Sequence, residues 1–387
     1  MARAFCVRVA SAALLALAAI APAAAQETIK IGLIAPLTGP FTTVGQEMQA
    51  AAKLYMQHNG ATVAGKTIEL IVRDDGGVPD NAKRIAQELI VNDKVSVLAG
   101  MGLTPIALAI GPLATQAKVP LVVMGAATST IPGSSPFIVR TSFAAAQPAV
   151  IGAQYFAKSG VKNVVTLVTD FAPGIEIETC FKKAFEAAGG QVVASLRVPI
   201  ANPDFAPFLQ RVADAKPEAL MIFVPSGQGA TLMRQFVERG LDKSGIKLLG
   251  DGSVLDDQQL DRVGDVALGV ISANHYSDAH PSALNKKFTA DFEKNAGMRA
   301  NFMGVGAYDG MALIYQALAK TNGDADGTKL IEAMKGASWE SPRGPMTIDP
   351  ATREVVHNIY LRKVEKVGTR YQNTEFETYP MVKNPAN

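Results

Sequence analysis

Two kinds of hydrophobic pattern alternate along the chain. Short apolar runs, such as Thr28 to Ala35, Val95 to Ala99 and Pro120 to Met124, have the length of strands that are buried on both faces. Between such runs lie segments like Val44 to Asn59, in which apolar residues recur at helical spacing on one face. A second alternation of the same kind begins at Gln147. Strands separated by helices predict parallel sheets, and the repetition predicts an α/β fold with two lobes.

The pattern changes towards the C-terminus. After a predicted short helix near Leu255 to Arg262 and one further strand, the segment from Ser282 to Gly336 predicts three helices and little strand. The strand pattern returns at Pro345 to Ile348 and at Asn358 to Val364. Because these helices follow the last strand of the second alternation, we expect the chain to cross back between the lobes near Tyr276, with this side chain facing the cleft.

Residues 1–25 have the features of a secretory signal peptide. Arg3 and Arg8 precede an apolar segment from Val9 to Ile20, and Ala23-Ala24-Ala25 forms a cleavage site before Gln26. The apolar segment is too short to span a bilayer, and no later segment reaches the roughly 18 uninterrupted apolar residues that a membrane helix needs. We therefore expect a soluble mature protein that is exported to the periplasm.

Composition narrows the possible functions. Loss of the two arginines of the signal peptide lowers the formal net charge from +2 to zero, which gives no support to nucleic-acid binding. Cys180 is the only cysteine of the mature chain, so no intramolecular disulfide is expected. About 360 mature residues exceed what one hydrophobic core usually serves, which again predicts two lobes.

No complete enzyme or cofactor motif occurs in the sequence. It lacks G-x-S-x-G, G-x-x-x-x-G-K-[ST] and H-E-x-x-H. Gly100-Met101-Gly102 is followed by Leu103-Thr104-Pro105, where a dinucleotide fingerprint needs a third small residue. His275, Asp278 and His280 lie close together without a further ligand at a usual zinc spacing. We therefore expect neither a cofactor nor a metal.

The stretch from Leu98 to Thr128 carries the candidate binding groups. A strand ends there in a glycine turn, and Thr104 and Pro105 follow as the N-cap and first residue of a helix. The N–H groups of a first helical turn make a site for anions. The next strand is followed by Ala126 to Thr128, which bring a hydroxyl and further N–H groups to the same edge, where open α/β sheets bind ligands. The alternative is that both threonines are ordinary caps without a ligand.

An ordered set of motifs resembles one protein family. The set includes IKIGLIAPLTGP, AGMGLTP, VPLVVMGAAT, FIVRTS, TDFAPG, LLGDG, GVGAYDG and RGPMTID. Over essentially all of its mature length, the chain resembles the type I periplasmic solute-binding proteins of the leucine/isoleucine/valine family, which serve ABC importers. The resemblance implies two Rossmann-like lobes of the Venus-flytrap type with a small molecule bound between them. It also implies a membrane permease as partner, and we expect a monomer.

The resemblance further implies three chain crossings between the lobes. They match Arg140 to Ser142, Ala273 to Tyr276 and Gly344 to Thr347. The N-terminal lobe would then comprise residues 26–140 and 276–344, and the C-terminal lobe residues 141–275 and 345–387. Three crossing strands are expected to let the lobes hinge and close over the ligand.

Some ligand-binding roles of the family fall on residues that the pattern had already indicated. The hydroxyl that holds the ligand carboxylate falls on Thr104, and its companion Ala-x-Thr falls on Ala126 and Thr128. No base stands beside these hydroxyls to activate them. The sequence therefore predicts a binding protein rather than an enzyme.

The chain departs from the amino-acid binders of this family elsewhere in the predicted pocket. Where those proteins carry tyrosines, this chain has Val44, Pro173 and Pro225. Where they carry the acid that pairs with the ligand's ammonium group, it has Gly252, with Asp251 adjacent. A buried ammonium without an acid partner costs several kcal/mol, so the departures favour a ligand that has no ammonium group.

The remaining predicted pocket residues are apolar or flat and suit an aromatic ring: Phe41, Leu103, Phe171, Pro173, Pro225 and, at the hinge, Tyr276. With the carboxylate clamp retained, the sequence favours a small aromatic carboxylate such as a benzoate or phenylpropenoate. Asp251 or Tyr276 would then meet a ring hydroxyl. The alternative is a branched-chain or other hydrophobic amino acid, with Asp251 as the partner of its ammonium group.

Overall fold

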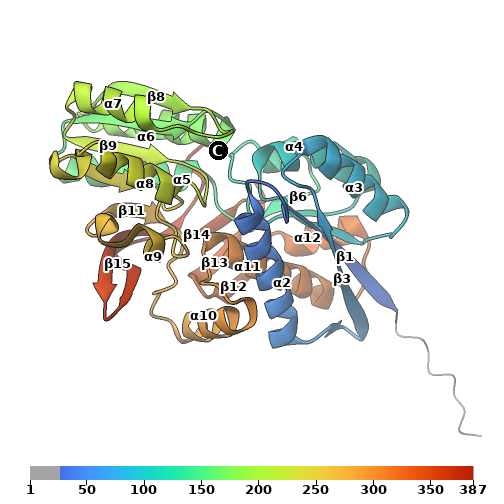
Figure 1. Cartoon of the computed structure of the whole chain (residues 1–387). Coiled ribbons are helices and arrows are strands. Elements are labelled where there is room, and N and C mark those ends of the chain that lie inside the picture. The colour runs from blue at the N-terminus through green and yellow to red at the C-terminus, as the bar shows by residue number, and fades with distance from the viewer. Residues whose placement is uncertain (1–26, 387) are drawn as a thin grey trace, which may run out of the picture.

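The computed structural model describes residues 27–386, which form two α/β lobes side by side (Figure 1). The predicted signal peptide lies outside the described residues. Within residues 27–386, no helix is both long and apolar enough to cross a bilayer.

The first lobe is built on a six-stranded sheet with the strand order β2-β3-β1-β4-β5-β6. Its strands are β1 (Thr28–Ala35), β2 (Thr62–Val63), β3 (Lys66–Asp74), β4 (Val97–Gly100), β5 (Leu121–Val123) and β6 (Ile138–Arg140). Neighbouring strands run parallel except β2 and β3. Its helices are α2 (Thr42–Asn59), α3 (Pro79–Val91), α4 (Thr104–Ala117), α10 (Ala283–Ala296), α11 (Phe302–Lys320) and α12 (Gly327–Met334). Figure 1 shows α10 and α11 next to α2, although they are far from it in the sequence.

Strand β4 is buried on both faces of the sheet, which accounts for the uninterrupted apolar run in its sequence. Val97 and Ala99 belong to the core cluster that includes residues of α2 and α11, whereas Leu98 belongs to the cluster that includes residues of α3 and α4. Helices therefore cover both faces of the sheet, and the strand has no polar face to present to water.

The second lobe is built on a nine-stranded sheet with the order β12-β13-β14-β11-β10-β9-β7-β8, and β15 pairs with β14. Its strands are β7 (Asn163–Thr169), β8 (Gln191–Val198), β9 (Ala219–Phe223), β10 (Lys247–Gly250), β11 (Ile271–Asn274), β12 (Ser338–Ser341), β13 (Gly344–Ile348), β14 (Val355–Val367) and β15 (Arg370–Val382). Its helices are α5 (Ala146–Lys158), α6 (Ala172–Ala187), α7 (Ala206–Ala215), α8 (Gly229–Glu238) and α9 (Leu260–Val263). Short 3-10 turns η1 (Pro132–Ser134), η2 (Leu241–Lys243) and η3 (Gly264–Ala267) complete the described chain.

The second sheet is mixed, and two of its details differ from the sequence prediction. Strands β7 to β11 are parallel, whereas β12 to β15 join them in antiparallel pairs. Strand β15 was not predicted, because its side chains are largely polar and half-exposed and its sequence has no apolar run. The predicted helix from Leu255 to Arg262 is a loop up to Gln259, and only the four residues of α9 are helical.

The three predicted crossings lie next to one another. The buried Arg343 guanidinium donates to the carbonyl oxygen of Ser142 (2.9 Å) and to that of Thr141, which places the first and third crossings side by side. In the second crossing, the ring of His275 stacks on Phe143 with 4.7 Å between ring centroids. The predicted third crossing, Gly344 to Thr347, coincides with β13.

Candidate ligand-binding site

Two strand ends of the first lobe form the floor of the candidate site. Gly100 closes β4 with φ +111°, and a Cβ atom there would lie 2.1 Å from the Ile34 carbonyl oxygen, so only glycine fits. Beyond it, the Met124 N–H donates to the Gly100 carbonyl oxygen (2.8 Å), and the Ala126 N–H donates to that of Met101 (2.9 Å). These bonds keep the loops after β4 and β5 together at the carboxyl edge of the sheet, the edge that the sequence indicated.

Thr104 and Thr128 form a buried hydroxyl pair at this edge. Their Oγ1 atoms are 2.9 Å apart, and Thr104 is 1% exposed. The prediction that Thr104 is the N-cap of α4 was wrong, because Leu103 takes the extended N-cap position and Thr104 is the first helical residue. Proline is tolerated throughout a first helical turn, so Pro105 permits a helix that begins one residue earlier. The Thr104 hydroxyl is therefore paired with another side chain.

Arg140 supports the threonine pair from behind. Its Nη1 donates to the carbonyl oxygens of Thr128 (2.9 Å) and Ala126 (3.3 Å), and its Nε donates to Glu354 Oε2 (2.8 Å). Both charged side chains are buried, and breaking such a pair is strongly destabilising. Sequence reasoning missed this positioning role, although an arginine inside the apolar strand β6 was a signal for it.

A narrow cavity lies between the lobes above the threonine pair. Eight of the ten predicted site residues line it: Phe41, Leu103, Thr104, Ala126, Phe171, Pro173, Pro225 and Asp251. Its volume is about 50 Å³, measured as the space open to the centre of a water molecule. One water needs about 15 Å³ on this measure, so the cavity is larger than a water site but narrow.

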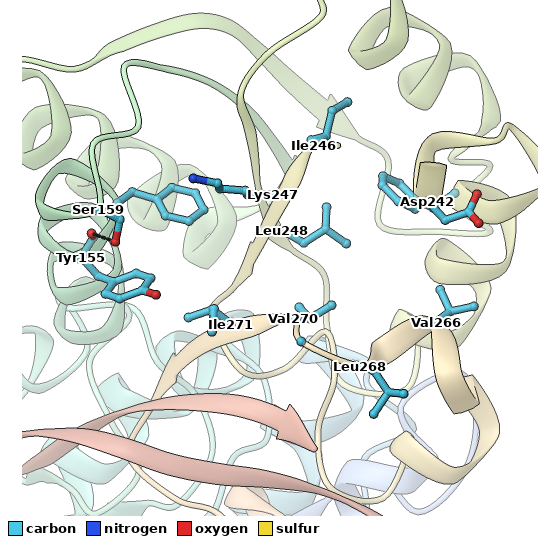
Figure 2. A pocket seen from close by; sticks show the side chains of 13 residues that line it. Tyr155, Ser159, Asp242, Ile246, Lys247, Leu248, Val266, Leu268, Val270 and Ile271 are labelled. Carbon is cyan, nitrogen blue, oxygen red and sulfur yellow. Dashed lines mark hydrogen bonds between the residues drawn. The ribbon is translucent and has the colours of Figure 1, made fainter. Parts of the chain in front are cut away.

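A different pocket opens on the second lobe alone (Figure 2). Lys247 and Leu248 at the start of β10 and Ile271 at the start of β11 line it, with Tyr155 of α5 and Ser159, which follows that helix, on its other side. It therefore lies at the amino ends of parallel strands, whereas open α/β sheets bind ligands at the carboxyl ends. The cavity between the lobes is the better candidate.

Aromatic and aliphatic side chains make most of the cavity wall. Phe171 stacks on Phe223 with 5.9 Å between ring centroids and 20° between ring planes. Phe223 and several other lining residues were not among the ten predicted site residues: Gly102, Gly125, Ala127, Phe143, Ile177, Ser226, Ser253, Phe302 and Met303. Val44, which the resemblance had matched to a pocket tyrosine, also lines the cavity. The walls are therefore suited to a flat apolar body.

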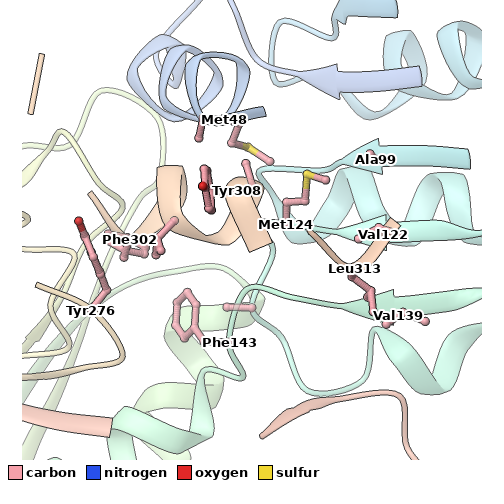
Figure 3. Close-up of a cluster of buried hydrophobic side chains, with 14 of the residues drawn as sticks. Met48, Ala99, Val122, Met124, Val139, Phe143, Tyr276, Phe302, Tyr308 and Leu313 are labelled. Carbon is pink, nitrogen blue, oxygen red and sulfur yellow. The ribbon is translucent and has the colours of Figure 1, made fainter. Parts of the chain in front are cut away.

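Thr128 and Tyr276 are the two predicted site residues that do not line this cavity. Thr128 is connected to the cavity indirectly, because its hydroxyl is hydrogen-bonded to that of Thr104, which lines the cavity. Tyr276 is fully buried in the hydrophobic core cluster that includes residues of α2 and α11 (Figure 3). Its hydroxyl donates to Asn285 Oδ1 (3.1 Å). The expectation that it faces the cleft is therefore corrected: after β11 the chain turns the ring into the core against Phe288.

A second polar group lies on the side of the cavity formed by the second lobe. Asp251 is 6% exposed, and its Oδ1 accepts hydrogen bonds from the Ser253 hydroxyl (2.6 Å) and backbone N–H (3.0 Å). Burial raises the pKa of the Asp251 carboxyl to about 7, although the bonds from Ser253 oppose this shift. Ser226 also lines the cavity, and its hydroxyl donates to Asp256.

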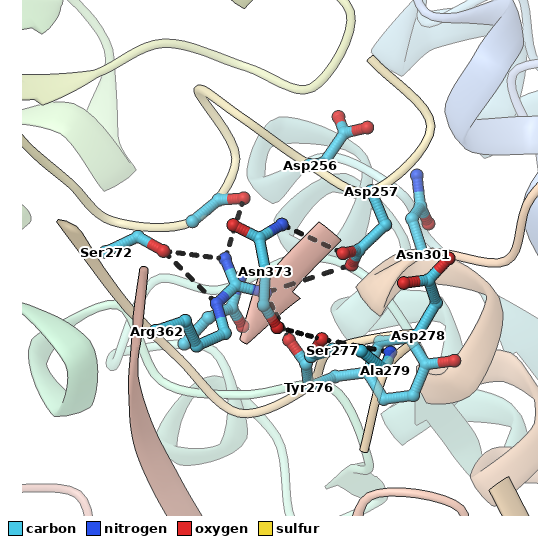
Figure 4. A network of polar contacts seen from close by, with 12 residues as sticks. Asp256, Asp257, Ser272, Tyr276, Ser277, Asp278, Ala279, Asn301, Arg362 and Asn373 are labelled. Carbon is cyan, nitrogen blue, oxygen red and sulfur yellow. Dashed lines mark hydrogen bonds and ion pairs between the residues drawn. The ribbon is translucent and has the colours of Figure 1, made fainter. Parts of the chain in front are cut away.

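Further buried acids lie in a polar network that includes Arg362 and Asn373 (Figure 4). Burial raises the pKa of Asp256 to about 6 and that of Asp257 to about 7. Asp257 Oδ1 accepts a hydrogen bond from Asn373 Nδ2 (2.8 Å), and its Oδ2 lies 3.9 Å from Arg362 Nη1. The Arg362 charge favours the ionised form of these acids but does not offset their burial.

Each lobe contributes polar groups to the cavity, and most of the remaining lining is apolar. The first lobe contributes the Thr104 hydroxyl and the start of α4, where Pro105 has no N–H and the Ile106 N–H donates to the Leu103 carbonyl oxygen (3.1 Å), so the N–H groups that remain for a ligand are those of Leu103 and Thr104. The second lobe contributes Asp251, Ser226 and Ser253. No lysine or arginine lines the cavity among the described residues, so an anion would be held by hydroxyls and N–H groups.

Residues 28–369 match the family model described as periplasmic binding protein. The chain belongs to the periplasmic binding protein family. This periplasmic binding protein is 41% identical over 384 residues to the "Leu/Ile/Val-binding protein homolog 6" of Brucella melitensis biotype 1, and the match covers 98% of each chain.

Two solved solute-binding proteins of ABC transporters from Rhodopseudomonas palustris are also similar to this periplasmic binding protein. The protein from strain BisB5, in complex with 3,4-dihydroxybenzoic acid, is 57% identical with a TM-score of 0.92. A second one, in complex with 4-hydroxybenzoate, is 40% identical with a TM-score of 0.90. Each comparison covers 93% of this chain and 99% of the other. The predicted two-lobe architecture of type I periplasmic binding proteins is confirmed.

Proposed function

We propose that this periplasmic binding protein is the solute-binding component of an ABC importer and binds a small aromatic carboxylate between its lobes. The observation that carries the proposal is a cavity between the lobes that is lined by Thr104 of the first lobe, by Asp251 of the second lobe and by aromatic side chains. The carboxylate would meet the Thr104 hydroxyl and the first turn of α4. A ring hydroxyl would reach Asp251 and its serine neighbours.

The energetics of this arrangement suit a single aromatic ring. An aromatic body that buries about 150 Å² gains nearly 4 kcal/mol before other costs, at about 25 cal/mol per Å². Hydrogen bonds from hydroxyl and N–H groups to a carboxylate are charge-assisted and about twice as strong as neutral ones. The narrow cavity favours a benzoate over a longer phenylpropenoate. The two similar proteins solved with hydroxybenzoates support this ligand class.

A hydrophobic amino acid is the competing ligand class. The name of the Brucella relative favours it, and a buried carboxyl on the cavity wall would be its ammonium partner. Asp251 is poorly suited to this role because burial raises its pKa to about 7 and Ser253 occupies Oδ1. The carboxyl is therefore only partly ionised at neutral pH, and binding of an ammonium group would include the cost of its deprotonation.

The remaining parts of the proposal concern export, assembly and motion. Residues 1–25 would be removed as a signal peptide, and the mature chain would act as a monomer that delivers its ligand to a permease. The two lobes would hinge about the three crossings and close over the ligand. The chain would release its ligand unchanged, because the threonine pair has no neighbouring base to activate it.

A thermal unfolding screen with small carboxylates tests the ligand class. Protein that has been unfolded and refolded to strip bound ligand is heated with benzoate, 4-hydroxybenzoate, 3,4-dihydroxybenzoate or leucine. A ligand at 100 times its Kd adds about 2.7 kcal/mol of stability, which is readily measured. The proposal expects stabilisation by the aromatic acids and none by leucine; the reverse pattern would contradict it.

A further inference from the structure

One hydrogen-bonded contact joins the two lobes beside the cavity. Ser129 belongs to the loop after β5 in the first lobe, and Glu176 belongs to α6 in the second lobe. The Ser129 N–H donates to Glu176 Oε2 (2.9 Å) and Oε1 (3.2 Å), and the Ser129 hydroxyl donates to Oε1. Both oxygens of one carboxylate are therefore bound by a single residue of the opposite lobe.

The contact lies beside the cavity wall on both sides. Ser129 directly follows Thr128, whose hydroxyl is paired with Thr104. Glu176 precedes Ile177 and follows Pro173 in the same helix, and both of these neighbours line the cavity. Movement of the lobes apart would break the contact and pull these two walls of the cavity away from each other.

The C-terminal segment adds a third participant. Asn384, which follows β15, places its Oδ1 3.1 Å from the Ser129 hydroxyl, and its Nδ2 donates to Glu354 Oε1 (3.1 Å). Glu354 is the ion-pair partner of Arg140, which holds the Thr128 carbonyl oxygen. The loop that carries Ser129 is therefore fixed in place, and Glu176 meets a preorganised pair of donors.

We propose that Glu176 is the positioning residue that holds the lobes closed around the bound ligand. This inference rests on the proposed binding function, and it adds the residue that sets how long the ligand is retained. In the closed form the carboxylate accepts charge-assisted hydrogen bonds, which are the stronger kind. In an open form the same carboxylate would be hydrated, so the contact favours closure without preventing release.

Variants of this contact test the inference. Glu176→Ala removes both acceptor oxygens, Glu176→Gln keeps one acceptor without the charge, and Ser129→Ala removes the hydroxyl. Glu186→Gln is the matched control, because Glu186 lies on the same helix with an exposed pairing to Lys182. Stopped-flow release of 4-hydroxybenzoate should be about 10-fold faster for Glu176→Ala and about 3-fold faster for Glu176→Gln, with unchanged association rates. The control should match the wild type.

Hydrogen exchange at the Ser129 amide gives a readout that needs no ligand. Its exchange should be faster in both Glu176 variants, while amides of the central strands and the ligand-free melting temperature of Glu176→Gln stay unchanged. Equal release rates in all variants would overturn the inference, and so would a melting temperature that falls in step with affinity. If the wild type binds leucine and no aromatic acid, the proposed function fails, and the same release experiment with leucine decides the role of Glu176.

Discussion

The hydroxyl oxygens of Thr104 and Thr128 lie 2.9 Å apart although 24 residues separate them in the chain. The pair exists because β4 and β5 are neighbouring parallel strands whose carboxyl ends meet at one edge of the sheet. One of the two hydroxyls donates a hydrogen bond to the other, and this bond restricts the direction in which the second hydroxyl can donate. A pair of this kind is preorganised for a carboxylate, since only one hydrogen of the two is left to donate to a ligand.

Replacement of either threonine by valine should weaken ligand binding. Thr104→Val and Thr128→Val keep the volume of the side chain but remove its hydroxyl, and each should raise Kd about 10-fold by calorimetry. The two losses should not add in the double variant, because the hydroxyls act as one unit. Thr115→Val is the control on the same helix, since the Thr115 hydroxyl donates to the Gly111 carbonyl oxygen. Additive losses would show that the threonines act independently.

Asp251 should distinguish hydroxylated from plain benzoates. Asp251→Ala removes an acceptor that the second lobe contributes to the cavity, so the Kd of 4-hydroxybenzoate should rise about 10-fold while that of benzoate changes little. Asp251→Asn keeps a carbonyl acceptor and should lie between the wild type and Asp251→Ala. Parallel titrations of the two ligands measure the difference. Equal losses for both ligands would mean that the ring hydroxyl lies elsewhere.

The buried acids should make stability depend on pH. Burial raises the pKa of Asp251 to about 7, well above the ordinary value of an aspartate, so the folded protein binds this proton more tightly than the unfolded chain. The contribution of Asp251 to the free energy of unfolding should therefore fall as the pH rises from about 4 to about 7, and Asp256 and Asp257 contribute in the same direction. Burial lowers the pKa values of His275 and His357, so these histidines contribute in the opposite direction. Denaturant unfolding at several pH values measures this dependence, and Asp251→Asn should remove the fall in stability that Asp251 contributes. The same pH dependence in Asp251→Asn and in the wild type would contradict the assignment.

Loss of the Tyr276 hydroxyl should leave ligand affinity unchanged. Tyr276→Phe removes the hydrogen bond to Asn285 in the core, and Tyr276 itself does not line the cavity. The cost should appear as about 1 kcal/mol of unfolding free energy, because a buried acceptor then loses its partner. Calorimetry and denaturant unfolding on the same sample separate the two effects. A clear loss of ligand affinity in Tyr276→Phe would indicate that Tyr276 faces the cleft, as the sequence predicted.

Local patterns predicted the part of the fold in which apolar residues recur with a clear period. The runs that became β4 and β5 and the helical segment of α2 were predicted to within about two residues. Strand β15 was missed because its pairing with β14 depends on a long-range contact and not on an apolar run. The same holds for the antiparallel edge of the second sheet, whose strands come from the C-terminal part of the chain.

Site residues could be predicted where they follow the end of a strand. They were harder to predict where only the packing of the two lobes brings a side chain to the cavity. Thr104 and Ala126 follow directly from strand ends, and both line the cavity. Phe223 and Phe302 lie in apolar segments that resemble any core residues, and only the packing of the lobes brings them to the cavity. Tyr276 was wrongly predicted to face the cleft. Its position in a crossing did not determine the direction of the ring, which packs in the core.

The central claim is that the cavity selects an aromatic carboxylate, and calorimetry on protein freed of bound ligand tests it most directly. Refolded wild-type protein is titrated in parallel with 4-hydroxybenzoate and with leucine. The account predicts binding of 4-hydroxybenzoate in the micromolar range, weakened in Thr104→Val, and no heat from leucine. Tight leucine binding that disappears in Asp251→Asn, together with no response to any aromatic acid, would contradict it.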